Sequence, residues 1–528
     1  MINTPLSLLR KLACAGSALG ISTVAQGAII TNGLLMDFDA TSWNGTGSIP
    51  NTGSVGGNFT QDGRPTRALA AGVNGAFFDG TDAFVGPATP AGITGTGDRT
   101  VEVWVYQGTV RAEETLVAWG KRGGPDGTNN SVNWGSNGTF GAFGGWGAGP
   151  DQGYGALQPA AGMWHHIAYT ADGANKIFYV DGVLATSEPN NAPALNTVAG
   201  LNILIGAQQN GAAAPGATVI DADNKLFGGV VGRVRVHDGV LSGADILNNF
   251  NAEKATFQLA ARPTAALTAA PTHRWSFNEV AGTSFADSGT AGSAGTAATL
   301  RGAGAVLNGS GVRLPGGASS TQAYVDLPNG VASGKDLSAG GYASVTYEVW
   351  LTANSNQNWS RVVDFGNSTG GEITSPGGSF NGANYMALTN NFGTGTDMRM
   401  ERIGGINGTR DAVGATILNS EQHIVITYDA ADGMWKWYQN GKLMDGFDSS
   451  APGLIDDVNN WLGRSNYAGD ANTDGTYNEF RIYNYPLTDA QIQRNFLDGP
   501  NVLSLVPEAS TASLSLLALG LLTRRRRK

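Results

Sequence analysis

The chain has 528 residues, and its 78 glycines are about twice the share usual in globular proteins. Between residues 28 and 505, 25 Lys and Arg residues stand against 41 Asp and Glu residues, which gives a formal charge of −16. This acidic balance excludes nucleic-acid binding, which needs a basic surface. The single cysteine, Cys14, precedes this body, which therefore has no disulfide or thiolate chemistry. Frequent glycines among 12 Trp, 14 Tyr and 19 Phe predict short aromatic-rich strands joined by tight turns.

The first 27 residues have the order of a secretory signal peptide. A basic pair at 10–11 precedes an apolar run over 12–24, and a small-residue stretch follows. Because a signal peptidase cleaves after small residues, we expect cleavage after Gly27. The sequence therefore predicts an exported protein.

The last 23 residues combine a short motif, an apolar run and a basic end. The motif is Val506, Pro507 and Glu508, the apolar run covers 512–522, and the basic cluster covers 524–528. An apolar helix of this length would rise about 16 Å, roughly half of a hydrocarbon core, so we expect only transient membrane contact. The basic cluster places that end on the cytoplasmic side and leaves the body outside.

This order of parts resembles the PEP-CTERM sorting signal of Gram-negative bacteria, although Ala509 stands where the second proline of the motif is expected. The resemblance implies an exosortase-type sorting enzyme as a partner. It also implies a place at the cell surface, in the outer envelope or in the extracellular matrix of a Gram-negative-type bacterium.

The body contains two diverged copies of one unit, 246 residues apart. A Glu-X-Trp strand at 101–105 recurs at 347–351, and an Arg-containing strand at 232–236 recurs at 478–482. The period of two in the first pair places Glu on one face of the strand and Val on the other.

Each copy also predicts two successive hairpins and a terminal helix. The second hairpin turns are Asp181-Gly182 and Asn440-Gly441, which suit type I′ turns because both central residues need positive φ. The helices are expected to begin after the N-caps Ser242 and Thr488 and to end near Phe250 and Phe496. The predicted hairpin strands cover 164–170, 176–180, 421–427 and 434–438.

This succession of strands resembles the laminin-G-like, concanavalin A-like jelly roll. The resemblance implies an all-β fold with two concanavalin A-like (laminin-G-like) jelly-roll sandwiches in tandem, at 28–252 and 273–498. The segment 253–272 between them is rich in small residues and proline, and we expect a semi-flexible linker.

No catalytic motif is found in either copy. Sandwich glycosidases of this fold carry a Glu-X-Asp-X-X-Glu cluster, because retaining hydrolysis needs two carboxylates about 5 Å apart. Glu102 and Glu348 each stand alone on their strands, and we expect them at solvated or edge positions. His166 and His423 occupy matching positions and are expected to be packed structural residues. We therefore predict no catalytic residues.

Aromatic residues spaced by glycines indicate a glycan site in the first copy. Jelly rolls of this type hold ligands at loop ends or on the concave face, and the apolar face of a sugar stacks on an aromatic ring. We predict that Trp134, Trp146 and Tyr154 contact a glycan. Packing of the same rings in the core is the alternative.

Calcium is the one cofactor that the sequence suggests. Asp287 lies in an early loop, where members of the resembled family place a cation-binding acid, and Glu479 on the final strand is the expected oxygen partner. The first copy has Arg233 in place of Glu479, so only the second copy is expected to hold the ion.

These patterns favour a non-catalytic surface or matrix protein that binds polysaccharide or a surface partner. Two alternatives stay open, namely a carbohydrate-active enzyme with an unrecognised site and a structural spacer of the envelope. Fold alone does not decide among them.

Overall fold

The computed structural model describes residues 27–147, 149–190, 194–221, 225–393 and 395–506. The predicted signal peptide up to residue 26 and the sorting signal from Pro507 onward, Glu508 included, lie outside the described residues. Of the predicted sorting motif, the structure describes only Val506.

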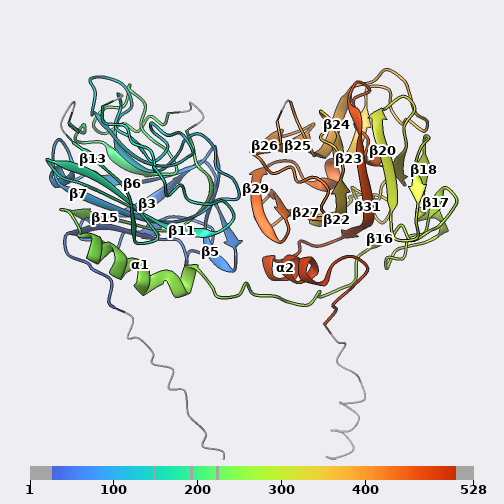
Figure 1. Cartoon of the computed structure of the whole chain (residues 1–528), viewed down its shortest axis with the longest axis horizontal. Coiled ribbons are helices and arrows are strands. Elements are labelled where there is room, and N and C mark those ends of the chain that lie inside the picture. The colour runs from blue at the N-terminus through green and yellow to red at the C-terminus, as the bar shows by residue number, and fades with distance from the viewer. Residues whose placement is uncertain (1–26, 148, 191–193, 222–224, 394, 507–528) are drawn as a thin grey trace, which may run out of the picture.

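The chain forms two β-sandwiches side by side, each made of two antiparallel sheets (Figure 1). This confirms the predicted all-β class. In each sandwich we call the sheet with the Glu-X-Trp strand the large sheet and the other the small sheet, although in the described part of the second sandwich both have eight strands. In the first sandwich the large sheet has the order β13 (Val183–Pro189), β12 (Asn175–Val180), β11 (Trp164–Ala171), β7 (Arg99–Tyr106), β15 (Gly228–Asp238), β5 (Val73–Asp79) and β4 (Thr66–Ala70), with β1 (Leu34–Asp39) also paired to β15. The small sheet has the order β10 (Phe143–Gly144), β9 (Asn129–Trp134), β8 (Glu114–Gly120), β14 (Asn202–Ile205), β6 (Ala83–Ala88), β3 (Asn58–Asp62) and β2 (Ile49–Pro50).

The second sandwich repeats this arrangement. Its large sheet has the order β19 (Val306–Leu307), β20 (Val312–Ala318), β31 (Ala471–Tyr483), β22 (Val345–Ala353), β27 (Gln422–Asp429), β28 (Met434–Gln439) and β29 (Lys442–Asp448), with β16 (His273–Trp275) also paired to β31. Its small sheet has the order β17 (Ser284–Phe285), β18 (Ala298–Arg301), β21 (Tyr324–Leu327), β30 (Asn459–Leu462), β23 (Arg361–Ser368), β24 (Gly382–Thr389), β25 (Met398–Ile403) and β26 (Gly408–Ala412).

The predicted hairpins are present in both copies. Asp181 and Gly182 take φ values of 52° and 76°, and Asn440 and Gly441 take 51° and 74°. These left-handed pairs join β12 to β13 and β28 to β29, as type I′ turns require.

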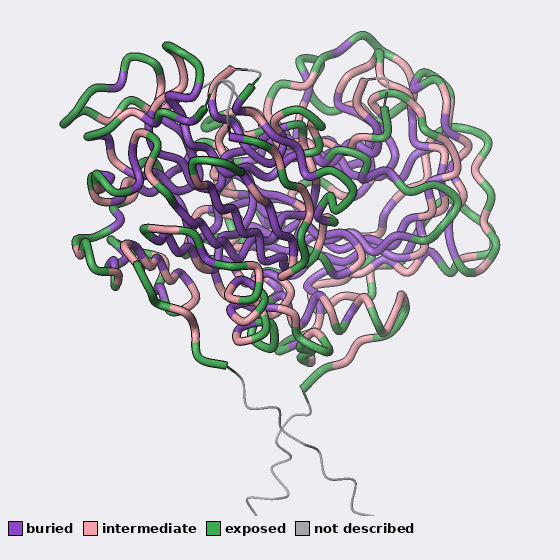
Figure 2. The backbone as a smooth tube through the Cα atoms, turned by 60° about the vertical axis from the view of Figure 1, so that its left-hand side comes forward, coloured by how far each residue is buried: buried purple, intermediate pink, exposed green. Residues whose placement is uncertain are grey.

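Each large sheet lies between the small sheet and a helix. On β7, Val101, Val103 and Val105 point into the core between the two sheets, where the backbone is almost wholly buried (Figure 2). Trp104 points to the opposite face, where its ring stacks on Phe257 of helix α1 (Gly243–Phe257) at a centroid distance of 4.4 Å. Helix, large sheet and small sheet are therefore successive layers.

The helices begin at the predicted caps. Ser242 and Thr488 form capping boxes at the starts of α1 and of α2 (Asp489–Asp498). Helix α1 runs to Phe257, past the predicted end near Phe250, so the segment predicted as linker begins inside a helix. Short 3₁₀ helices are η1 (Ala91–Ile93), η2 (Ala294–Thr296) and η3 (Pro452–Leu454).

The rest of the connecting segment is anchored, which differs from the semi-flexible linker that we predicted. The Leu267 N–H donates to the Ser504 carbonyl at 2.7 Å, and the Val506 N–H donates to the Leu267 carbonyl at 2.9 Å. Leu267 is fully buried. Arg262 also forms an ion pair with Asp489 of α2 at 3.0 Å. Non-local partners supply contacts that composition does not reveal.

The two sandwiches share an apolar cluster on the outer faces of their large sheets. The Tyr106 hydroxyl donates to the Leu443 carbonyl at 3.0 Å, and Arg111 reaches Asp445 at 2.6 Å across the boundary. Because the cluster includes buried side chains of both copies, the sandwiches pack as one body. Its buried members are Ala68, Ala70, Val73, Phe77, Trp104, Tyr106, Trp164, Val230, Phe257, Leu267, Val425, Met434, Tyr438, Leu443, Tyr483, Leu487 and Ile492.

Both described ends of the chain lie on the side of the molecule where α1 and α2 lie (Figure 1). Within the part of the chain that the structure describes, neither helix has the length and apolar character needed to cross a membrane.

A charge in the shared cluster should separate the sandwiches. Leu443→Asp removes a buried leucine, which costs about 2–5 kcal/mol, and adds an unpaired carboxylate. We expect the native protein to unfold in one calorimetric transition and Leu443→Asp in two, with faster proteolysis at the connecting segment. Val183→Asp, at the exposed first position of β13, is the control. One unchanged transition in Leu443→Asp would contradict joint folding.

Candidate functional site

A cavity of about 480 Å³ lies on the outer face of the small sheet in the first sandwich. Along β9, Val132 and Trp134 point into the core, so the alternate residues Asn129, Ser131 and Asn133 point outward. The cavity is built on this polar face and on the loops around it. Its lining residues are Glu113, Arg122, Asp126, Asn129, Thr139, Phe140, Gly144, Trp146, Gly147, Asp151, Gln208 and Lys225.

Two buried amides at the base of the cavity keep unpaired polar atoms. The Asn129 Nδ2 group donates to the Gln208 Oε1 atom at 2.8 Å and to the Gly144 carbonyl at 3.1 Å. Among the described residues, Asn129 Oδ1 and Gln208 Nε2 have no hydrogen-bond partner. Both residues are only 2% exposed. An acceptor and a donor are thus buried side by side without partners, which is costly unless a ligand or water completes them.

Trp146 stands half-buried beside this cavity in a strained conformation. Its φ is 65°, in the left-handed region where a bulky residue costs about 1–3 kcal/mol. The indole N–H donates to the Gly124 carbonyl at 2.9 Å, and the Arg122 guanidinium lies 5.6 Å from the ring centroid. These contacts hold one aromatic face in a fixed place, which suits stacking on a sugar ring.

The acidic groups of the cavity have different environments. Lys225 neutralises Glu113 at 2.8 Å. Burial raises the pKa of Asp151 to about 6, although the Gly145 N–H donates to its carboxylate at 2.9 Å. Asp151 therefore changes from a hydroxyl donor to a carboxylate acceptor near pH 6.

The prediction that Trp134 and Tyr154 contact a glycan is wrong. Trp134 is 0% and Tyr154 2% exposed, and both rings belong to the apolar core of the first sandwich. The Trp134 indole N–H donates to the Thr109 carbonyl, and the Tyr154 hydroxyl donates to the Asn133 carbonyl at 2.6 Å. Of the three predicted rings, only Trp146 lines the cavity.

The residues that sequence reasoning missed are Asn129, Gln208, Asp151 and Arg122. The alternation of side chains along 129–134 is a usable signal, because it puts Trp134 inward and Asn129 and Asn133 outward. No local signal pairs Asn129 with Gln208, which is 79 residues away.

The two carboxylates of the predicted calcium site are engaged elsewhere. Asp287 accepts from His273 at 2.7 Å and from the Arg274 and Gly289 N–H groups. Glu479 accepts from Arg481 at 2.9 Å and from the Arg274 side chain. Cationic and backbone donors occupy the oxygens that calcium would need. Across the described ranges, no group of three or more His, Cys, Asp or Glu side chains could hold a metal ion.

The charge difference between Arg233 and Glu479 has a structural cause. Asp37 on β1 lies opposite Arg235, and Arg274 on β16 lies opposite Arg481, so Asp37 and Arg274 are equivalent positions. Arg233 lies 3.8 Å from Asp37 in the first copy, and Glu479 pairs with Arg274 in the second. The ion pair is present in both copies with its polarity reversed.

A family model for the concanavalin A-like lectin/glucanases superfamily, of the laminin G type, matches residues 79–247 and 319–493. The chain belongs to this family. No curated protein matches the sequence.

Solved structures give distant likenesses. The CBM40 module of the Ruminococcus gnavus IT-sialidase is 17% identical over 35% of this chain and 95% of that chain, with a TM-score of 0.28. Domain 4 of AbnA, a GH43 extracellular arabinanase from Geobacillus stearothermophilus in complex with arabinotriose, is 16% identical over 42% and 99%, with a TM-score of 0.28. The binding domain of botulinum neurotoxin DC in complex with rat synaptotagmin II is 15% identical over 43% and 51%, with a TM-score of 0.32. Likenesses this weak carry no argument about ligands.

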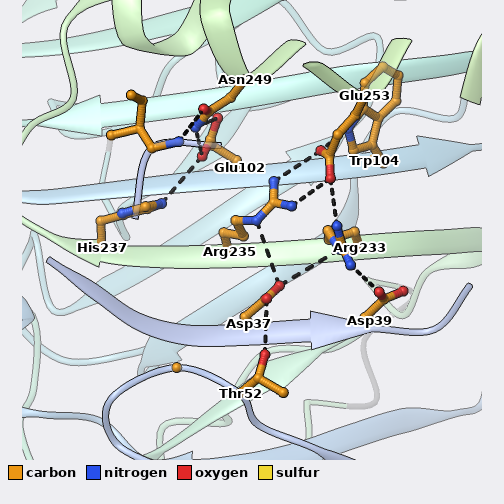
Figure 3. Close-up of polar contacts among 12 residues, drawn as sticks. Asp37, Asp39, Thr52, Glu102, Trp104, Arg233, Arg235, His237, Asn249 and Glu253 are labelled. Atoms are coloured by element: carbon orange, nitrogen blue, oxygen red, sulfur yellow. Dashed lines mark hydrogen bonds and ion pairs between the residues drawn. The ribbon is translucent and has the colours of Figure 1, made fainter. Parts of the chain in front are cut away.

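In this concanavalin A-like chain, Glu102 and Glu348 are buried on central strands, so the predicted solvated or edge position is wrong. Glu102 accepts from Asn249 of α1 at 2.9 Å and lies 3.3 Å from His237 (Figure 3). His166 also lies 3.3 Å from its carboxylate. Burial alone would raise the pKa of Glu102, but the contacts with His166 and His237 outweigh it and lower the pKa. The side chain is enclosed and unavailable as a nucleophile.

Glu348 has the same place in the second domain. Its carboxylate accepts from His423 and Asn495 at 2.8 Å and from Arg481 at 3.1 Å. Burial opposes the charge, but Arg481 and His423 outweigh it and lower the pKa of Glu348 to about 2. His166 and His423 are both buried, as predicted, and each contacts the glutamate of its own domain.

The cluster under α1 continues into an ion network that has no full counterpart in the second domain. Glu253 accepts from the Trp104 indole at 2.8 Å, from Arg235 at 2.5 Å and from Arg233 at 2.6 Å (Figure 3). The equivalent position is Gly499, whose φ of 76° ends α2. This difference explains why α1 is longer.

Removal of the Glu348 carboxylate should destabilise the second domain. Glu348→Ala removes one of the two carboxylates that pair with the buried Arg481 guanidinium and the acceptor of His423 and Asn495, and loss of one partner of a buried pair costs about 3–5 kcal/mol. Urea denaturation should report this loss. Glu421→Ala, at an exposed position before β27, should change stability by less than about 0.5 kcal/mol. Equal stability of the two variants would contradict the role of Glu348.

His273 should make stability depend on pH. Burial lowers its pKa, but bonds to Asp287 and Asp336 outweigh this and raise the pKa to about 9. The imidazolium therefore stabilises the fold fully below pH 6.5, and this contribution is lost as pH rises through 9. The difference in unfolding free energy between native protein and His273→Gln should be large at pH 6 and small at pH 10. A constant difference in urea denaturation would refute this assignment.

Proposed function

We propose that the chain is an exported, non-catalytic surface or matrix protein that binds polysaccharide through the cavity of its first domain. The unpaired Asn129 Oδ1 and Gln208 Nε2 atoms carry this proposal. A sugar hydroxyl both donates and accepts, so one hydroxyl could complete both atoms. The half-buried face of Trp146 lies on the same cavity and suits the apolar face of a sugar ring.

The size and composition of the cavity support a carbohydrate ligand. Its volume of about 480 Å³ is within the range of small-molecule sites. Amides, carboxylates and two cations supply polar contacts, while Trp146 and Phe140 supply aromatic surface. An apolar ligand would leave these polar groups unpaired.

A carbohydrate-active enzyme is the second candidate, because three carboxylates, those of Glu113, Asp126 and Asp151, line the same cavity. Burial raises the pKa of Asp151 to about 6, a value suited to a general acid. Of the other two, Glu113 is held in an ion pair with Lys225, which weakens it as a nucleophile or base. This pairing favours binding over hydrolysis.

Export and surface retention rest on the sequences of the two ends. The signal peptide at 1–27 and the sorting motif Val506, Pro507 and Glu508 make an exosortase-type enzyme the expected partner. The described ends lie on the helix side, whereas the cavity lies on the outer face of the small sheet. Two sheet layers separate them, so attachment through the tail would leave the cavity facing outward.

Trp146→Ala should weaken polysaccharide binding at least about tenfold on a glycan array, because it removes the stacking surface but no core side chain. Met163→Ala, at an exposed position of the same domain, is the matched control. The array is run with and without calcium, which also tests the predicted cofactor.

Full retention of binding by Trp146→Ala would overturn the assignment of this cavity. Release of oligosaccharides from the bound polymer would support the enzyme instead. Absence of both binding and release would leave the structural spacer as the best account.

A further inference from the structure

A second cavity, of about 280 Å³, lies on the outer face of the small sheet in the second domain. On β24 and β25, Met386, Leu388, Met398 and Met400 point into the core, so Tyr385 and Glu401 point outward. The strands match those under the first cavity, because β23 and β24 follow β30 in the sheet as β8 and β9 follow β14. The lining residues are Trp359, Arg361, Tyr385, Glu401, Tyr467 and Asp470.

Three aromatic rings wall this cavity. The rings of Tyr385 and Tyr467 are nearly perpendicular, with centroids 5.8 Å apart, and their hydroxyls lie 3.4 Å apart. Trp359 is half-buried with a φ of 59°, so it shares the strained backbone region of Trp146 in the first cavity. The Arg361 and Arg399 guanidiniums lie 5.5 and 5.6 Å from the Trp359 ring centroid, so the negative π-face of this ring already attracts cations.

Negatively charged side chains outnumber positively charged ones around the cavity. Arg361 is 1% exposed and lies 3.3 Å from Asp364, 3.4 Å from Asp470 and 3.7 Å from Glu401. One buried guanidinium is thus the shared ion-pair partner of three carboxylates. The neighbouring Arg399 adds no surplus charge, because Asp411 binds it through two hydrogen bonds of 2.6 and 2.9 Å.

Glu401 has a carboxylate oxygen, Oε2, that accepts no hydrogen bond from the described residues, although Arg361 lies 3.7 Å away. The residue is 8% exposed. Burial raises the pKa of Glu401 and of Asp470, and it raises the pKa of Asp364 to about 6. A cation that entered the cavity would stabilise all three carboxylates in their charged form.

We propose that this cavity binds the ammonium group of a de-N-acetylated amino sugar, with Glu401 as the ion-pair partner and the aromatic rings as the stacking surface. The inference rests on the proposed function for the class of ligand, a polysaccharide. Rings stack on the sugar and attract a cation, and the Glu401 oxygen that accepts no hydrogen bond from the described residues can accept one from an ammonium group. The formal charge of −16 between residues 28 and 505 draws cationic polymers to the protein.

A divalent metal fits this cavity less well. Calcium takes six to eight oxygen ligands, whereas three of the six lining residues are aromatic and one is an arginine.

The test compares glucosamine oligosaccharide with its N-acetylated form of equal length, by calorimetric titration of the purified protein. The two probes differ in the ammonium group, so we expect at least about tenfold tighter binding of the glucosamine form. Glu401→Gln keeps the shape of the side chain and should remove this preference. Trp359→Ala should weaken both probes, and Trp146→Ala should leave the preference intact.

Equal affinity for the two probes would overturn the proposal, as would an unchanged preference in Glu401→Gln at native melting temperature. The proposal would also be overturned if the native protein did not bind the glucosamine form, even if it bound other glycans on the array. Trp146→Ala could retain binding on the glycan array while Glu401→Gln loses the preference for the glucosamine form. That result would contradict the glycan site in the first domain and support the ammonium site in the second.

Discussion

A carboxylate buried beneath the terminal helix fixes the outer layer of each domain. Glu102 and Glu348 lie on central strands, where a lone charge would be expensive, and each accepts a hydrogen bond from an asparagine of the helix. Because the carboxylate is enclosed and paired from several sides, the helix has one favourable position over the sheet. That position decides which part of the large sheet is left open.

The open part of each large sheet is apolar, and the other copy covers it. Tyr106, Leu443 and their neighbours form one buried cluster from both domains, and the connecting segment is hydrogen-bonded through Leu267. Each domain therefore buries a face that it would otherwise expose to solvent. The small sheets are the layers that remain free, and both cavities lie on their outer faces.

Features that depend on neighbouring residues could be predicted from the sequence. The left-handed turn at Asp181 and the caps Ser242 and Thr488 follow from local backbone chemistry, and the repeated strands give the two sandwiches. The burial of Glu102 could not be predicted from its strand, because the covering Asn249 is 147 residues away. Part of the candidate site could be predicted, because alternation along 129–134 turns Trp134 into the core, but no local pattern brings Gln208 to Asn129 from 79 residues away.

Differences between the copies are of two kinds. In the scaffold they compensate each other: where the first copy has Asp37 with Arg233, the second has Arg274 with Glu479, and an ion pair forms in both. In the cavities, the differences between the two copies do not compensate each other. Asn129 Oδ1 in one domain and Glu401 Oε2 in the other are buried and accept no hydrogen bond from the described residues. A buried polar atom that the described residues leave without a hydrogen bond is costly unless a ligand or water completes it. Because one cavity leaves neutral amide atoms unpaired and the other a carboxylate oxygen, the two domains should select different chemical groups.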